Sequence, residues 1–315
     1  MRTRIVRGLM IAMLALGIAM SSGTVVAGHL EDGIAAAQRG DFATAMKLLR
    51  PLAEQGSKEA QFNLGVMYQN GDGAAQNYKE AMKWFRLAAE QGDAGGQFNL
   101  GLMYQNGIGV APDGKEAVKW YRLAAGQGLA NAQSNLGWMY HKAEGVSQDY
   151  KEAMKWYRLA AEQGDAIGQF SLALMYASAL GGPQDYTEAV KWYRLAAGQG
   201  TVAAQVNLGA MYSQGQGVVQ DYREAMKWYR LAAKQGNALA QYNVGTMYQD
   251  GLSVPQDFVR AYMWVDLATS SLDGASGKIA TNNRDTLAAK MTPAQIAQAQ
   301  EMARRCQASN YKNCN

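Results

Sequence analysis

The chain has 315 residues, of which 48% are apolar, with 30 basic and 26 acidic side chains. Three of the basic residues are Arg2, Arg4 and Arg7, so residues 28–315 hold 27 basic and 26 acidic residues, a net charge of +1. A balance this even argues against a nucleic-acid partner, which would require a basic surface.

Residues 1–27 have the pattern of an export signal. A basic start precedes an apolar run over residues 9–20, and Val25 and Ala27 place small side chains before a cleavage site at Gly28. A bilayer-spanning helix needs about 20 apolar residues, and Ser21 interrupts this run sooner. We expect cleavage, a periplasmic or secreted mature chain, and no stable membrane insertion afterwards. An uncleaved membrane anchor is the alternative.

Residues 28–56 predict an irregular opening unit. Gly40-Asp41-Phe42 joins two short helical patterns, without the longer loop of later units. The second pattern places apolar residues at i, i+3, i+4 and i+7, which is typical of one helix face. These residues are Ala45, Leu48, Leu49 and Leu52. The end units of a solenoid are often atypical because they close its core, so we expect an N-terminal cap.

Residues 57–272 repeat one pattern six times with a period of 36 residues. The clearest marker is a tryptophan, found at Trp84, Trp120, Trp156, Trp192, Trp228 and Trp264. Tyr68 recurs in the same register. A fixed period of this length predicts an all-α solenoid of antiparallel helix pairs, with the tryptophans filling its core rather than holding a cofactor.

The first helix of each unit has a constant side. In the first repeat this side comprises Ala60, Gln61, Leu64, Gly65 and Tyr68, which fall on one side of a helical wheel. A glycine inside a helix costs about 1 kcal/mol relative to alanine. We expect close helix packing to compensate, with the repeated tyrosine and tryptophan filling the space around Gly65.

The ends of the helices also carry signals. Gly71-Asp72-Gly73 is a turn that recurs as Gly107-Ile108-Gly109 and Gly215-Gln216-Gly217 and lacks a lysine partner, so we interpret it as structural rather than phosphate-binding. Asn77 and Glu80 predict a capping box at the start of the second helix, and Gly92 ends that helix. The predicted caps of first helices are Ser57, Asp93, Asp165, Thr201 and Asn237.

The repeated pattern resembles the Sel1-like repeat family. It reads Ala60-Gln61-x-Asn63-Leu64-Gly65-x-Met67-Tyr68, then Gly71-x-Gly73, then Ala81-x-x-Trp84-Phe85-x-x-Ala88-Ala89. The resemblance implies a right-handed superhelix, related to tetratricopeptide repeats, that acts as a scaffold for protein complexes. It also implies envelope signalling or host interaction for an exported member. A cysteine-rich branch of the family has penicillin-binding or β-lactamase activity, but its disulfides within each unit are absent here.

The positions that vary most between units are 59, 62, 66, 69 and 70 and their equivalents, which span about 100° on the other side of the first helix. They carry large apolar and amide side chains, and we expect a concave groove for a protein or peptide partner. The alternative is that the aromatic rings pack sideways against the next unit. The predicted groove residues are Phe62, Val66, Gln69, Phe98, Leu102, Gln105, Trp138, His141, Phe170, Leu174 and Tyr242.

The second helices carry a basic stripe, represented by Lys79, Lys83 and Arg86. Glu80 and Glu90 lie near these side chains on the helical wheel, so many of the charges have local partners. We interpret the stripe as a solvated outer face rather than a site for an anionic polymer.

Residues 273–315 predict two closing helices and a tail. The first helix is expected over residues 278–290, and the second begins with Thr292 as its cap and Pro293 as its first residue. Cys306 and Cys314 are expected to form a disulfide in an oxidising compartment.

Evidence for chemistry is sparse. Ser309 and Lys312 match the S-x-x-K pattern of penicillin-interacting serine enzymes, but its companion motifs S-D-N and K-T-G are missing. We expect no catalytic site, no metal site and no cofactor. A hydrolase of the β-lactamase or penicillin-binding type and a cell-wall polysaccharide binder are the alternatives to a protein-binding scaffold. The oligomeric state stays open.

Overall fold

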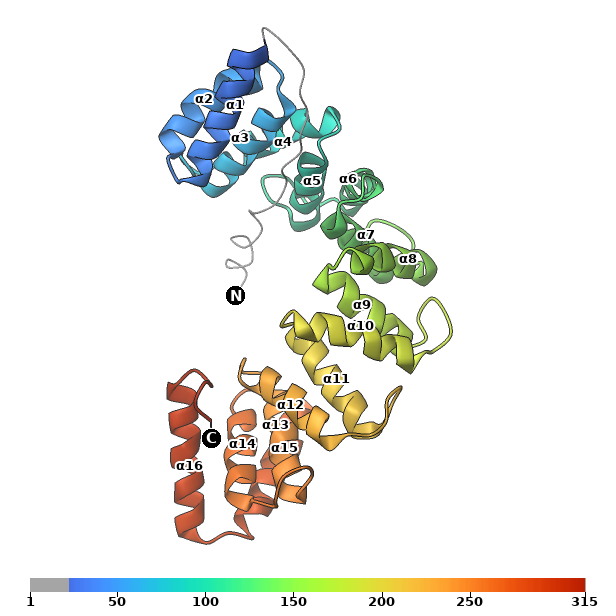
Figure 1. Ribbon diagram of the computed structural model, residues 1–315, viewed down its shortest axis with the longest axis vertical. Helices are drawn as coiled ribbons and strands as arrows, with labels where there is room; N and C mark the ends of the chain where they lie inside the picture. Colours follow the sequence, from blue (N-terminus) through green and yellow to red (C-terminus); the bar gives the residue numbers. More distant parts are fainter. Residues whose placement is uncertain (1–22, 315) are drawn as a thin grey trace. The chain divides into compact units, whose positions relative to one another are not determined.

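In the computed structural model, which describes residues 23–314, every regular element is a helix (Figure 1). The first eight helices are α1 (Gly23–Gln38), α2 (Phe42–Glu54), α3 (Lys58–Asn70), α4 (Tyr78–Glu90), α5 (Ala94–Asn106), α6 (Gly114–Gly126), α7 (Ala130–Lys142) and α8 (Tyr150–Glu162). The other eight are α9 (Ala166–Ala177), α10 (Tyr186–Gly198), α11 (Val202–Gln214), α12 (Tyr222–Ala233), α13 (Ala238–Asp250), α14 (Phe258–Thr269), α15 (Gly274–Ala288) and α16 (Pro293–Ala308). The predicted all-α solenoid is confirmed.

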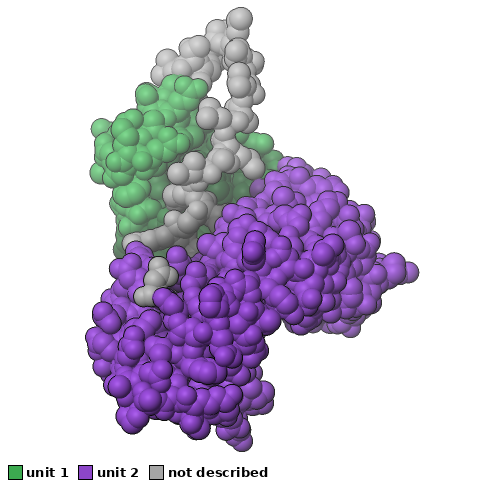
Figure 2. Space-filling model, turned by 60° about the horizontal axis from the view of Figure 1, so that its bottom comes forward, with its two compact units in different colours: residues 1–103, 108–110 green, residues 104–107, 111–315 purple. Residues whose placement is uncertain are grey.

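The chain divides into two compact units, coloured separately in Figure 2. The first comprises residues up to 103 together with 108–110, and the second comprises 104–107 and 111–315. Within each unit, consecutive helices pair into hairpins such as α3/α4 and α7/α8. In the second unit each second helix also packs on the first helix of the next hairpin, as α8 does on α9.

Residues 1–22, most of the predicted signal peptide, lie outside the described residues. The predicted cleavage site at Gly28 falls within α1. Across residues 23–314, none of the helices combines the length and apolarity that crossing a bilayer requires.

At the start of each second helix, only one side of the predicted capping box forms: the cap side chain accepts from the backbone, but the residue three positions on does not bond back to the cap. The Asp149 carboxylate accepts hydrogen bonds from the backbone N–H groups of Lys151 (2.9 Å) and Glu152 (3.0 Å). The Glu152 side chain, however, does not return to the cap but accepts from Lys155 and Trp156 further along the helix. Within the described residues, the reciprocal box forms at the start of α16, between Thr292 and Gln295.

Most of the first helices have the predicted caps. Ser57, Asp165 and Asn237 each accept a backbone N–H with their side chains, and Asp93 accepts from Gly96. Thr201 is the N-cap residue of α11, as predicted, but its side chain makes no capping hydrogen bond. Its hydroxyl is therefore not needed to start α11.

A buried glutamine joins each repeat of the second unit to the one before it. The Nε2 groups of Gln133, Gln169 and Gln205 each donate to a carbonyl in the last turn of the preceding second helix, at 3.2 Å. Their Oε1 atoms accept from the glutamine that ends their own hairpin: for Gln205 this donor is Gln235, at 3.0 Å. Because the side chains are buried, both hydrogen-bonding groups need these partners. We call these residues the glutamine ladder.

The glycines inside the first helices allow an aromatic ring to pack closely against the helix, but this ring does not belong to the predicted tyrosine or tryptophan. A Cβ on Gly65 would lie 2.6 Å from the ring of Phe85, and one on Gly137 would lie 2.9 Å from the ring of Tyr157. The space around Gly65 is therefore filled by the residue that follows the repeated tryptophan, which corrects the assignment to Tyr68 and Trp84. The cost of a glycine inside the helix is offset because the helix packs directly on an aromatic ring of the second helix.

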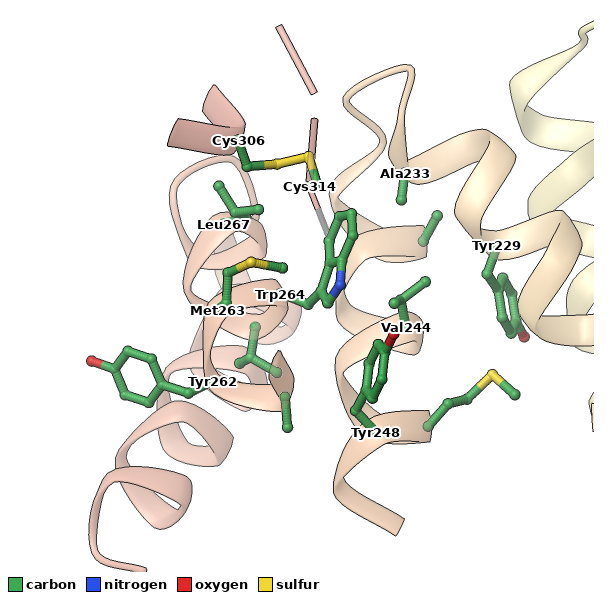
Figure 3. Close-up of a cluster of buried hydrophobic side chains, with 14 of the residues drawn as sticks. Tyr229, Ala233, Val244, Tyr248, Tyr262, Met263, Trp264, Leu267, Cys306 and Cys314 are labelled. Atoms are coloured by element: carbon green, nitrogen blue, oxygen red, sulfur yellow. A yellow bond between two sulfur atoms is a disulfide. The ribbon is translucent and has the colours of Figure 1, made fainter. Parts of the chain in front are cut away.

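The C-terminal end of the solenoid is closed by α15 and α16, which both pack on α14. On the preceding second helix, the side chain of Lys227 is 56% exposed and Leu231 is 41% exposed. The equivalent residues of α14 are Met263 and Leu267, which are 1% and 3% exposed. Figure 3 shows both side chains beside Trp264 and the disulfide between Cys306 and Cys314. The outer face of the last second helix is thus apolar and covered.

Replacing Gln205 by leucine should lower the free energy of unfolding by about 1–2 kcal/mol, because two hydrogen bonds at a repeat junction are lost. Urea unfolding followed by circular dichroism at 222 nm measures this. Gln214→Leu, at the exposed end of the same helix, is the matched control. Equal shifts for both variants would contradict a special role for the ladder.

Reducing the Cys306–Cys314 disulfide should destabilise the C-terminal end by about 2–3 kcal/mol, the loop-closure value for eight residues. Thermal unfolding with and without dithiothreitol, followed by circular dichroism at 222 nm, reports the change. A Cys306→Ala/Cys314→Ala variant should not respond to the reductant. Identical unfolding of the wild-type chain under both conditions would refute the stapling role.

Candidate functional site

The predicted groove residues lie on the first helices of the repeats. Trp138 is the one exposed member of the set, at 39%. The others are half-buried: Phe62, Val66, Gln69, Phe98, Leu102, Gln105, His141, Phe170, Leu174 and Tyr242. They are neither enclosed between the hairpins nor fully open to solvent.

One row of these residues contacts neighbouring helices. The Phe62 ring lies 5.9 Å from the Phe85 ring, and a Cβ on Gly95 in the next first helix would lie 2.7 Å from Phe62. Phe170 lies 5.8 Å from Tyr193 in the same way. Sideways packing therefore accounts for part of each ring, and only the remaining surface is available to a partner.

The next row, one helical turn further, faces outward more fully. It contains Trp138 and Leu174 in the second unit. Two further apolar residues are exposed near the starts of first helices, Ile167 at 60% and Leu239 at 47%. They occupy the variable position equivalent to Glu59, but the predicted groove residues included none from this position. A large apolar side chain at a variable position was the signal in the sequence that could have identified them.

Tyrosines of the second helices form hydrogen bonds beneath this surface. The rings of Tyr121, Tyr157 and Tyr193 are buried, yet each hydroxyl hydrogen-bonds to a half-buried side chain of the next first helix. The partners are Asn135 for Tyr121, Ser171 for Tyr157, and Asn207 for Tyr193, whose Nδ2 donates at 3.0 Å. Sequence reasoning missed this row because a constant aromatic position looks like core.

The same tyrosines stay protonated well into alkaline solution. Burial raises the pKa of Tyr193 to about 12, and it raises the pKa values of Tyr121 and Tyr157 as well. Their hydroxyls are therefore neutral hydrogen-bonding groups at any physiological pH. Tyr121 also donates to Oε1 of Gln105 at 2.6 Å.

The first helices of the second unit carry almost no charge. In α7, α9, α11 and α13 the acidic and basic residues are Lys142 and Asp250, each at the C-terminal end of its helix. His141 lies next to Lys142, edge-on to Tyr150 at 5.4 Å between ring centroids. Burial and the nearby Lys142 lower the pKa of His141, which favours its neutral form.

The charges of the second helices are paired within the protein. Glu152 accepts from Lys155 and from the Trp156 indole, both at 3.1 Å, and the Lys155 ammonium lies 5.4 Å from the centre of that indole. Arg158 donates to the hydroxyl of Tyr176 in the next first helix, at 2.7 Å. The arginines thus bridge consecutive repeats, whereas the sequence analysis assigned them glutamate partners.

The S-x-x-K serine has a structural role. Its Oγ donates to the Cys306 carbonyl at 2.8 Å and accepts from the backbone N–H of Asn313 at 2.9 Å. Ser309 therefore closes the tail beside the disulfide. Within the described residues, no three His, Cys, Asp or Glu side chains gather in a way that could hold a metal ion.

A known repeat family matches the sequence of this chain along most of its length. The family model described as Sel1 repeat matches residues 11–57, 58–93, 94–129, 130–165, 166–201, 202–237 and 238–270. The first matched segment includes the predicted capping unit, 28–56. Among curated proteins, none matches the chain.

Solved structures of Sel1 repeat proteins are similar to this chain. One from Oxalobacter formigenes is 34% identical with a TM-score of 0.68, covering 78% of this chain and 98% of that one. The protective antigen c5321 of uropathogenic Escherichia coli, which displays an SLR fold, is 29% identical with a TM-score of 0.40, covering 91% and 78%. The repeated matches along most of the chain show that it belongs to the Sel1 repeat family, a tetratricopeptide-like fold that generally serves as a scaffold for protein–protein interaction.

Proposed function

We propose that this protein is a non-catalytic adaptor of the periplasm or the secreted space, which binds a protein or peptide partner through the first-helix surface. The observation that carries the proposal is the contrast between the two faces of the second unit. The first helices present variable apolar residues with almost no charge, and the second helices present charges that include one repeated Glu–Lys pair in each helix.

The first-helix surface has apolar area to bury. Trp138, Ile167 and Leu239 are exposed at variable positions, and burial of apolar surface is the main favourable contribution to most protein–protein association. Exposed aromatic residues of this kind are frequent anchors of protein interfaces. Variation between repeats at these positions provides a different surface at each point along the stack.

An exported location is supported by two features at opposite ends of the chain. Residues 1–27 have the signal-peptide pattern, and the disulfide between Cys306 and Cys314 is of a kind that persists in oxidising compartments. A non-catalytic role is supported by the engagement of Ser309 in the tail and by the pairing of the second-helix charges.

A photo-crosslinking amino acid at position 138 or 167 should give discrete protein adducts in producing cells, because both positions are exposed on the first-helix surface. The same crosslinker in place of Leu195, which is 47% exposed on a second helix, is the matched control. Adducts should be read by denaturing gel and mass spectrometry. Equal adducts at position 195, or none at 138 and 167, would contradict the proposed binding face.

The mature chain should begin at Gly28, since Val25 and Ala27 fit the residues before a signal-peptidase cut. N-terminal mass mapping of the protein from the periplasm and the culture medium tests this. Ala27→Arg is expected to block processing and to leave precursor with the membrane fraction, while Ala35→Arg, beyond the cut, should leave processing intact. An unprocessed wild-type N-terminus would contradict the proposal.

A further inference from the structure

We propose that the second-helix face of the second unit docks on a membrane surface that carries anionic phospholipid. This inference goes beyond the proposed function, because it concerns the second helices, which the proposed protein partner does not use. It starts from an exposed leucine that recurs in α6, α8, α10 and α12, surrounded by basic side chains. We call these four residues the leucine row: Leu123, Leu159, Leu195 and Leu231.

The leucine row is open to solvent. In chain order its residues are 46%, 38%, 47% and 41% exposed. The equivalent residue of α14 is Leu267, which is buried in the core cluster beside α16. The chain therefore covers this leucine position once, at its C-terminal end, and leaves the same apolar side chain uncovered in the four preceding hairpins.

Basic side chains lie around each leucine on the same face of the helix. In α6, Lys115, Lys119 and Arg122 precede Leu123 by eight, four and one positions. At 3.6 residues per turn these four residues fall within a sector about 100° wide. All four are exposed, whereas Glu116 is half-buried. The outward surface of this helix therefore combines an apolar side chain with positive charge.

The positive charge exceeds what the ion pairs neutralise. The helices α6, α8, α10 and α12 hold eleven basic and five acidic residues, a net charge of +6, although residues 28–315 carry only +1. The repeated Glu–Lys pair cancels one charge of each sign in every helix, which leaves Glu162 as the remaining acidic residue. Arg158 donates to a tyrosine hydroxyl rather than to a carboxylate. Charge segregated in this way attracts an anionic surface.

The packing of α16 on α14 shows what a protein helix requires on this face. There Met263, which is 1% exposed, stands in place of the repeated lysine, so no ammonium group is buried. On the earlier helices the equivalent lysine side chains are 56–58% exposed. A closely packed protein helix would remove these charges from water at a cost in free energy. The retained lysines therefore argue against a protein helix as the occupant.

A bilayer surface accommodates both kinds of side chain. Leucines enter the boundary between headgroups and acyl chains, while long basic side chains extend to the phosphate groups. Near an anionic bilayer each lysine or arginine strengthens binding about fivefold. Such docking is peripheral and leaves the first helices free for a protein partner.

The test uses the chain from Gly28 onward with vesicles of two compositions, phosphatidylcholine alone and phosphatidylcholine with an equal part of phosphatidylglycerol. Co-sedimentation should show at least tenfold tighter binding to the anionic vesicles, because several basic residues act together. Binding should weaken as salt is added, since salt screens exposed charges. Equal affinity for both vesicles, or no binding to either, would overturn the inference.

A first set of substitutions addresses the charge. Lys115→Gln, Lys151→Gln and Arg223→Gln combined should weaken binding to the anionic vesicles at least tenfold. These side chains are exposed, and across residues 23–314 none of them takes part in an ion pair, so the fold should not depend on them. Wild-type affinity in this variant would contradict the role of the second-helix face.

A second set addresses the leucine row. Replacing its first three members by serine should weaken vesicle binding about tenfold, because apolar surface is no longer buried in the bilayer. Ile167→Ser combined with Leu239→Ser, both exposed on first helices, is the matched control and should bind as the wild type does. Circular dichroism and thermal unfolding verify the fold of each variant. Unchanged binding of the leucine variant, or an equal loss in the control, would refute docking through this row.

An acidic polypeptide is the competing ligand for a basic face. Binding of poly-glutamate without binding of anionic vesicles would assign the face to an acidic protein and overturn the membrane proposal. The outcomes are separable from the proposed function, because crosslinking at positions 138 and 167 reports a protein partner on the first helices. Position 195 keeps its value as the control there, since a bilayer yields no discrete protein adduct.

Discussion

The glutamine ladder is the constraint on which the rest of the second unit depends. A helix pair cannot bury all of its apolar surface by itself, so the core is complete only where consecutive hairpins meet. Apolar packing alone tolerates sliding, whereas a buried amide must find both a donor and an acceptor. Gln133, Gln169 and Gln205 find them in two different hairpins. The ladder therefore sets the register in which tyrosines, arginines and surface side chains of successive repeats meet.

Much of this architecture follows from the sequence alone. The period predicts the helix pairs, the constant side of the first helix predicts which residues are buried, and Thr292 with Pro293 predicts the start of α16. The sequence could not show whether the hydrogen-bonding partner of a side chain lies in its own repeat or in the next one. In a periodic chain a constant residue meets constant neighbours both in its own hairpin and in the next. Arg158 reaches Tyr176, eighteen positions on, and a helical wheel cannot show this.

The sequence predicted which side of the first helices forms the candidate site, but not which parts of its residues are accessible. The variable side of the first helix does carry Trp138 and the half-buried aromatic rows. A wheel gives the direction of each side chain but not the lateral distance to the next helix, so it could not separate the packed part of Phe62 from its accessible part. The tyrosine hydroxyls were missed for a related reason: a helical wheel cannot show that a buried tyrosine hydrogen-bonds to the next first helix through its hydroxyl.

The covered outer face of α14 determines where the molecule can change in length. Every earlier second helix of the second unit meets a further hairpin, so the array could grow or shrink there by whole units of 36 residues. After α14 it could not, because Met263 stands where the preceding second helix carries a lysine, Leu267 is covered, and α16 occupies their side.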